Sequence, residues 1–276
     1  MGERYALTPS EGQGLALASA LRLELKKLRH KRLWLIALCM VAMQLLWLGH
    51  GWFGHRGGGA TPGYPALLLQ APALNAVFLP LLSTVIAATV CDVEAGGDML
   101  KSLLTLQRAG SLFWTKLLVS TGMLAIVVTL QEAGLVGIAV AAKLDAIPVR
   151  ELAIYWVSTC VVCVFCASLA QALSLLAANQ FVPMVTGVVL SFFGLFSMYF
   201  PEAIMRMVPS AYFGLLSTVG VSMQDGVATY VSRPWAWGYA VVLIVATALL
   251  SVLAARAFSR KELDRKSTRL NSSHGS

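Results

Sequence analysis

The chain has 276 residues, of which 58% are hydrophobic and only 12% charged, and its formal net charge is +8. Soluble domains carry roughly 25% charged residues, so this composition excludes an ordinary soluble domain and indicates a membrane protein. The positive excess requires no nucleic-acid partner. Basic residues at the cytoplasmic ends of membrane spans, and their attraction to anionic lipids, account for it.

Residues 1–32 are predicted to be a cytoplasmic N-terminus that contains an interfacial amphipathic helix. Its leucines recur at helical spacing while its cations occupy another face, a pattern typical of helices that lie in the membrane interface. The leucines are Leu17, Leu21, Leu25 and Leu28, and the cations are Arg22, Lys26, Lys27 and Arg29. The alternative is a solvated, positive flank of the first span. The basic run begins too late for a cleavable signal peptide.

Residues 33–258 are predicted to form one transmembrane domain. An apolar run of about 18 residues is long enough to cross the hydrocarbon core as a helix. Six spans are predicted, at residues 33–50, 73–91, 112–142, 152–178, 181–200 and 235–257. Lys and Arg residues gather before the first span, after the second and after the last, which places both termini in the cytoplasm. The expected fold class is an all-α polytopic membrane protein.

Two external connections differ in character. The stretch from Trp52 to Pro65 is rich in turn formers. His50 and His55 have no carboxylate or cysteine beside them to complete a metal site, so we interpret this stretch as a loop. The stretch from Pro201 to Pro234 is too apolar for a free loop but is interrupted by Pro and Gly, which predicts short, partly re-entrant helices.

Residues 259–276 are predicted to be a cytoplasmic tail. The end of this tail, DRKSTRLNSSHGS from Asp264 to Ser276, resembles the conceptual translation of a sequencing adapter. We therefore give residues 264–276 no structural or functional weight.

Glu132 is an ionisable residue within the third predicted span. It lies about 24 Å along a helix from Lys116 at the inner boundary, which places it in the outer half of the membrane. An ionisable group at that depth indicates a pathway or pairing role. Gln44 and Gln171 are further candidates for a substrate pathway. The alternatives for Glu132 are a structural hydrogen bond, for example to Gln44 or to a neighbouring subunit, and a protonated acid close to the headgroups.

Cys160, Cys163 and Cys166 are spaced like part of an iron–sulfur ligand set. They lie within an uninterrupted apolar run, and the other cysteines are on other predicted spans, so we interpret them as small packing residues. No bound cofactor, metal site or catalytic arrangement of side chains is predicted for this chain.

The segment between the second and third spans carries a mixed charge pattern. Its acids come first and its bases last, which suits the dipole of a helix, and its leucines gather near one side. The fragment GGDMLKS has Leu100 where a phosphate-binding loop requires Gly, so nucleotide binding by this chain is excluded. The pattern predicts a cytoplasmic amphipathic helix over residues 92–109 that rests on the membrane or fills a groove in a partner.

The sequence resembles the permease subunits of type 2 ABC exporters. The resemblance consists of the basic amphipathic helix, the six spans and one cytoplasmic pattern, which here is Glu94, Gly97, Lys101, Leu103-Leu104, Arg108 and Lys116. The length of the chain and the element from Pro209 to Phe213 look like those of permeases of lantibiotic export and self-immunity.

The resemblance implies that residues 92–109 form a coupling helix docked on a separate ABC ATPase. The coupling residues carried over are Glu94, Gly96, Gly97, Lys101, Leu103, Leu104 and Arg108. ATP and Mg would bind to that partner, so this chain would not itself be an enzyme. Two permeases, identical or different, would assemble with two ATPases in a bacterial cytoplasmic membrane and export a hydrophobic or amphipathic peptide, lipid or drug.

Two other function classes stay open. An ATP-independent secondary transporter or channel would use Glu132 as its intramembrane acid. A membrane scaffold or sensor would use the cytoplasmic helix to recruit some other partner. Co-purification with an ATPase would separate the first hypothesis from these two.

Overall fold

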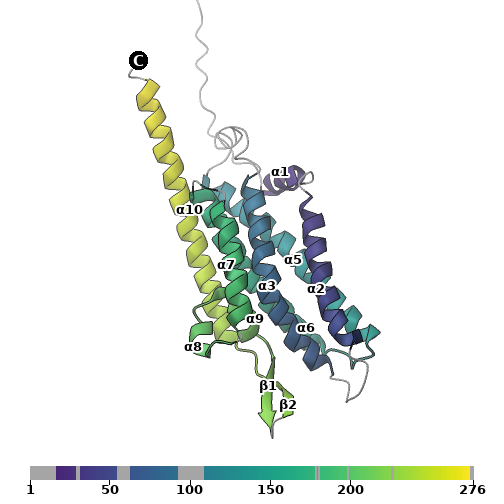
Figure 1. Cartoon of the computed structure of the whole chain (residues 1–276). Coiled ribbons are helices and arrows are strands. Elements are labelled where there is room, and N and C mark those ends of the chain that lie inside the picture. The colour runs from purple at the N-terminus through teal and green to yellow at the C-terminus, as the bar shows by residue number, and fades with distance from the viewer. Residues whose placement is uncertain are drawn as a thin grey trace, which may run out of the picture.

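A computed structural model gives the course of the chain over residues 17–28, 32–54, 63–92, 109–177, 179, 181–197, 199–224 and 227–273 (Figure 1). Over these ranges the protein is mostly helical. The seven longer helices are α1 (Leu17–Leu28), α2 (Leu33–Gly54), α3 (Tyr64–Asp92), α5 (Ala109–Ala141), α6 (Val149–Leu176), α7 (Phe181–Ser197) and α10 (Trp237–Ser273). The ordering of helices along the chain follows the predicted spans.

Within the described ranges, five helices are long and apolar enough to cross a membrane: α2, α3, α5, α6 and α10. The sixth apolar helix, α7, has 17 residues, or about 25 Å at 1.5 Å per residue. It runs alongside the others in the bundle (Figure 1). A multi-pass membrane protein is therefore confirmed. The prediction that there are six spans stays a prediction for α7.

The amphipathic helix α1 and the C-terminal part of α10 lie at the same end of the bundle, here called the α1 end (Figure 1). The strands β1 (Val219–Gln224) and β2 (Val227–Ser232) lie at the opposite end, here called the hairpin end. An even number of helices that cross the membrane would place α1 and the end of α10 on the same side, as observed here.

Helix α3 lies in the middle of the bundle and contacts α2, α5, α6 and α7. It begins at Tyr64, although the predicted second span begins only at residue 73. The prediction was wrong here because Pro72 and the turn formers before it read as a break, whereas the helix continues through Pro72 and Pro80. Bundled membrane helices tolerate such prolines because neighbouring groups satisfy the freed backbone.

Helix α7 packs closely on α3 through two glycines. A Cβ on Gly187 would lie 2.7 Å from the Thr84 Oγ1, and a Cβ on Gly194 would collide with the Ala76 carbonyl oxygen. Small residues of this kind let helix backbones approach each other in membranes, where no water is available to drive association. This contact ties α7 to the centre of the bundle.

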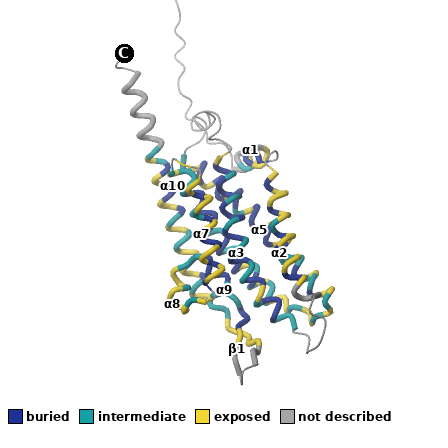
Figure 2. Tube along the Cα trace, viewed as in Figure 1, coloured by how far each residue is buried: buried dark blue, intermediate teal, exposed yellow. Residues whose placement is uncertain are grey.

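Buried residues concentrate on α3 and on the inner faces of α5 and α6, whereas α2, α7 and α10 carry most of the exposed apolar side chains (Figure 2). Large apolar patches are rare on the surfaces of soluble monomers. The exposed apolar side chains of α2, α7 and α10 are explained if these helices face lipid.

The segment between α7 and α10 departs from the predicted all-α fold. It contains α8 (Glu202–Met205), η1 (Pro209–Ala211) and α9 (Tyr212–Leu215), as the apolar pattern predicts, but then forms the antiparallel pair β1–β2. Two runs rich in β-branched residues flank Asp225-Gly226, a sequence typical of hairpin turns that the prediction of short helices overlooked. The side chains of Tyr212 and Phe213 are buried against the bundle core.

Candidate functional site

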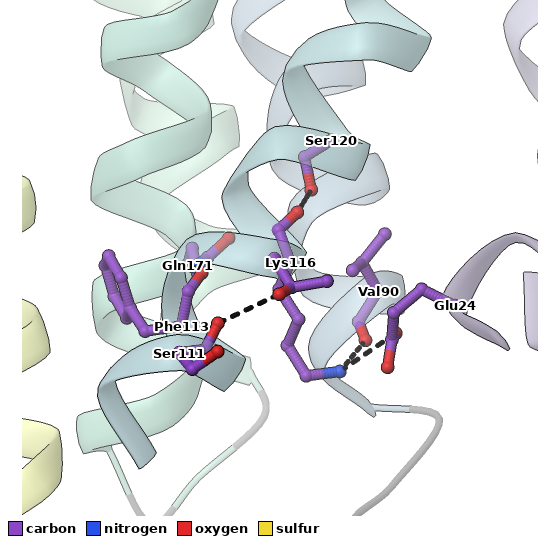
Figure 3. Close-up of polar contacts among 8 residues, drawn as sticks. Glu24, Val90, Ser111, Phe113, Lys116, Ser120 and Gln171 are labelled. Carbon is purple, nitrogen blue, oxygen red and sulfur yellow. Dashed lines mark hydrogen bonds and ion pairs between the residues drawn. The ribbon is translucent and has the colours of Figure 1, made fainter. Parts of the chain in front are cut away.

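Lys116 lies on α5 at the α1 end of the bundle and is completely buried. Its Nζ donates a hydrogen bond to the Val90 carbonyl at 2.8 Å and lies 3.3 Å from the Glu24 Oε2 (Figure 3). The ammonium group therefore joins three helices: α1 through Glu24, α3 through Val90, and its own helix α5. We call Glu24, Val90 and Lys116 the lysine node.

The Val90 carbonyl is a natural acceptor for this cation. Val90 lies in the last turn of α3, which ends at Asp92. The last four carbonyls of a helix lack intrahelical donors, and the helix dipole makes that end favourable for a positive charge. Lys116 thus supplies a cap that the sequence of α3 does not provide.

Glu24 lies inside the apolar stripe of α1 rather than on its charged face. The stripe of Leu17, Leu21 and Leu28 recurs at three- and four-residue spacing, and Glu24 falls within it. Its side chain is buried and faces Lys116 (Figure 3). A buried carboxylate is expensive unless it is paired. This break in the stripe was the signal that could have revealed the pair from sequence.

Gln171 on α6 lies close to the lysine node. Its Nε2 donates to the Phe113 carbonyl on α5 at 2.7 Å, and its side chain is fully buried (Figure 3). At the same end, the Lys261 Nζ on α10 donates to the carbonyls of Leu175 and Leu176 at 3.3 and 3.0 Å. The ends of α3 and α6 are thus both capped by a lysine from a neighbouring helix.

The predicted coupling residues fall within residues 93–108, outside the described part of the chain. They are Glu94, Gly96, Gly97, Lys101, Leu103, Leu104 and Arg108. The residues that flank this segment are described: α3 ends at Asp92 and α5 begins at Ala109. The lysine node connects these two flanks directly, because Val90 precedes the segment and Lys116 follows it.

A second polar cluster lies deeper in the bundle, about 22 Å along α3 from Val90. The Asn75 Oδ1 accepts hydrogen bonds from Gln44 Nε2 on α2, at 2.6 Å, and from Gln131 Nε2 on α5. The Asn75 Nδ2 donates to the Tyr155 hydroxyl on α6 at 2.8 Å. All four side chains are buried. We call them the asparagine hub, which joins four helices through one carboxamide.

Comparison with known protein families identifies the chain. The sequence model of the family described as ABC-2 family transporter protein matches residues 20–194. The chain belongs to the ABC-2 transporter family. The match runs from α1 into α7, and it includes the lysine node, the asparagine hub and the segment at residues 93–108. The family is one of membrane permeases, typically non-catalytic components that work with an ATPase. No individual curated protein matches the chain.

Of the polar residues predicted for a substrate pathway in this ABC-2 permease, two lie inside the bundle. Gln44 belongs to the asparagine hub, and Gln171 is buried against α5. Glu132 is only half-buried on α5, directly after Gln131. The hydrogen bond from Glu132 to Gln44, one of the alternatives for this acid, is not formed; Gln44 instead pairs with Asn75. Sequence reasoning did not identify Asn75 or Tyr155.

Helix α1 forms where the sequence of the ABC-2 permease predicts an interfacial helix. Arg22 and Lys26 are exposed on it, opposite the buried Glu24 and Leu28. The helix includes Lys27, whose side chain is not described, and ends before Arg29, which lies outside the described residues. Arg22 and Lys26 thus lie on the exposed side of α1, but Leu25, which was predicted for the apolar face, is 54% exposed beside them, because Glu24 is the residue that faces the bundle. Contact of α1 with the membrane interface stays a prediction.

The cysteines of the fourth predicted span pack within the permease. Cys163 and Cys166 are fully buried in the main apolar core, and Cys160 packs against it. Over the described residues, no group of three His, Cys, Asp or Glu side chains is arranged to hold a metal ion. His50 lies near the end of α2, and His55 lies outside the described ranges.

Proposed function

We propose that this chain is the membrane subunit of an ATP-driven exporter and that residues 92–109 couple it to a separate ATPase. The observation that carries the proposal is the lysine node, which gathers both flanks of that segment at one buried point. Family membership supports it, because the family match includes the whole segment. A displacement of the segment would then act on α3 and α5 together.

In this proposal α7 is the sixth span and the α1 end is cytoplasmic. Support comes from the exposed cations of α1 and from Arg256 and Arg260, which belong to the C-terminal part of α10, the part that lies at the same end (Figure 1). Positive residues close to span ends favour the cytoplasmic side. The hairpin β1–β2 would then face the outside of a bacterial cytoplasmic membrane.

The working unit would contain two permeases, identical or different, and two ATPases that bind ATP and Mg. ATP-driven closure of the ATPases would move the segment at residues 93–108, and the central helix α3 would carry this movement into the bundle. Its many buried contacts favour motion as a rigid body, because packed interiors do not deform continuously.

The cargo would be hydrophobic or amphipathic, such as a peptide, a lipid or a drug. Export of a lantibiotic, or immunity against one, is one form that this function would take. The resemblance of the element from Pro209 to Phe213 supports it.

Replacing Leu104 with Asp tests the coupling segment. We expect this variant to insert normally but to lose stimulation of ATP hydrolysis, because a charge on the apolar side of the helix would oppose docking in a partner groove. The measurement compares ATP hydrolysis by the purified partner with and without reconstituted permease. Thr105→Asp is the matched control, since helical spacing turns Thr105 about 100° from Leu104, away from the side where the leucines gather. Normal stimulation by the Leu104→Asp permease would show that docking does not use this side.

A further inference from the structure

We propose that Lys116 is a positioning residue of the coupling site: it locks α1 to both flanks of residues 93–108, so that α1 moves with that segment. The inference rests on the proposed coupling function and adds α1 to the moving part. Without the lock, α1 would be a separate lipid anchor that the ATPase does not displace.

The geometry of the lysine node makes α1 part of one unit with α3 and α5. Val90 lies in the last turn before the coupling segment, and Lys116 lies about two turns into the helix that follows it. A single ammonium group contacts the Val90 carbonyl and the Glu24 carboxylate, at 2.8 and 3.3 Å. Neither flank can shift relative to α1 without breaking one of these contacts.

The ion pair also fixes the rotation of α1 about its own axis. A helix at a membrane interface is otherwise oriented only by its apolar face. Because Glu24 points toward Lys116, the exposed Arg22 and Lys26 must point away from the bundle. The same contact therefore sets which face of α1 meets the lipid headgroups.

Stability alone does not explain a buried ion pair. Replacing both partners of such a pair with apolar side chains of similar volume is often neutral or stabilising, whereas removing one partner is strongly destabilising. The Glu24 and Lys116 side chains are 5% and 1% exposed, so this rule applies to them. The structure assigns the pair a role in geometry, and a double apolar replacement can separate that role from folding.

The first experiment compares Glu24→Met/Lys116→Met with the wild-type permease. We expect the double variant to insert and to keep its thermal unfolding midpoint, while stimulation of the partner's ATP hydrolysis falls about tenfold, a typical size for coupling between sites. Lys261→Met is the matched control: it removes a lysine that caps helix carbonyls at the same end but does not contact α1. This control should retain stimulation within about twofold, because it leaves the lysine node intact.

The second experiment measures a distance and needs no change in the node. Spin labels are placed at the exposed positions Arg22 on α1 and Trp114 on α5, in a background without the five native cysteines. We expect the same narrow distance distribution in the nucleotide-free and ATP-trapped complexes, because α1 and α5 move as one body. In the double Met variant the distribution should broaden.

Two results would overturn the inference: a double Met variant that stimulates ATP hydrolysis like the wild type, or a label distance that changes on ATP trapping. If the double variant does not fold, the wild-type label distance still decides. The outcome for Leu104→Asp keeps the two proposals apart. Uncoupling by Leu104→Asp together with normal coupling in the double Met variant would reject only the role of Lys116, whereas normal coupling in both would also reject docking through the Leu104 side of the segment.

Discussion

Gln131 and Glu132 are consecutive residues on α5 that lie in different environments. Gln131 is 2% exposed and donates to Asn75, so it belongs to the interior of the bundle. Glu132 is half-buried, and its carboxyl makes no hydrogen bond or ion pair with any side chain in the described part of the chain. The helix therefore directs the amide inward and the acid toward its flank.

This placement leads to a prediction for Glu132→Gln. If ATP drives transport, the variant should retain transport within about twofold of the wild type. The carboxamide has the shape of the carboxyl group, and the substitution breaks no side-chain hydrogen bond or ion pair of Glu132 among the described residues. The measurement is uptake of a fluorescent hydrophobic peptide into inside-out vesicles with ATP. Loss of uptake with intact ATP stimulation would instead favour the secondary transporter that uses Glu132 as its acid.

Asn75→Leu should destabilise the bundle by about 1–3 kcal/mol, because it leaves buried polar groups on three other helices without their partner. The groups are the amides of Gln44 and Gln131 and the hydroxyl of Tyr155. Thermal unfolding of the purified permease in lipid nanodiscs measures the loss. Ser168→Ala is the control, since the Ser168 hydroxyl bonds only to a carbonyl of its own helix. Equal midpoints for the two variants would mean that the asparagine hub does not hold the helices together.

Gly194→Ala tests the close contact between α7 and α3. The added methyl group would meet the Ala76 backbone, which cannot rotate away, so we expect a loss of about 1–3 kcal/mol from overpacking. At Gly122 on α5 an added Cβ has nothing within 4 Å, so Gly122→Ala should be neutral or slightly stabilising. The measurement compares the thermal unfolding midpoints of the Gly194→Ala and Gly122→Ala variants. A tolerated Gly194→Ala would show that α7 is free to move away from α3.

Glu202 gives a pH dependence at the hairpin end. Its Oε1 accepts hydrogen bonds from the Tyr239 hydroxyl at 2.6 Å and from the Arg206 guanidinium at 2.8 Å. These contacts, the Tyr239 bond first, lower the pKa of the Glu202 carboxyl from its ordinary value of 4.5. A lowered folded-state pKa stabilises the protein above that ordinary value, and the contribution disappears as the pH falls through the lowered one.

We therefore expect the wild-type unfolding midpoint to fall more steeply than that of Glu202→Gln as the pH drops below about 4.5. The difference should be small, because Glu202 and Arg206 are exposed and solvent screens them. Adding salt should reduce it further. If the unfolding midpoints of the two proteins fall in parallel with pH, the ionised Glu202 carboxylate does not stabilise the folded state.

Much of the fold could be predicted from local sequence pattern. Apolar run length placed α2, α5, α6, α7 and the start of α10 to within several residues, because a long apolar run has few ways to satisfy its backbone in lipid. The helix α10 continues to Ser273, well beyond the predicted end of the span at residue 257. The basic amphipathic pattern likewise located α1. The errors came where local signals conflict with context: Pro72 lies inside α3, and the hairpin β1–β2 replaces part of an expected helical segment.

The polar contacts could not be predicted in the same way. The hydropathy pattern predicts that Gln44, Asn75, Gln131 and Tyr155 lie on four helices. It does not predict how each helix is rotated about its own axis, and so which side chains meet. The same limit hid the partner of Lys116, which looked like a simple marker of the inner boundary. The sequence by itself determined the membrane class, the order of the longer helices and the exposed cations of α1. The tertiary structure decided that Glu24 meets Lys116 and that Asn75 joins four helices, because these contacts depend on helix rotation and packing, which residues far apart in the chain set together.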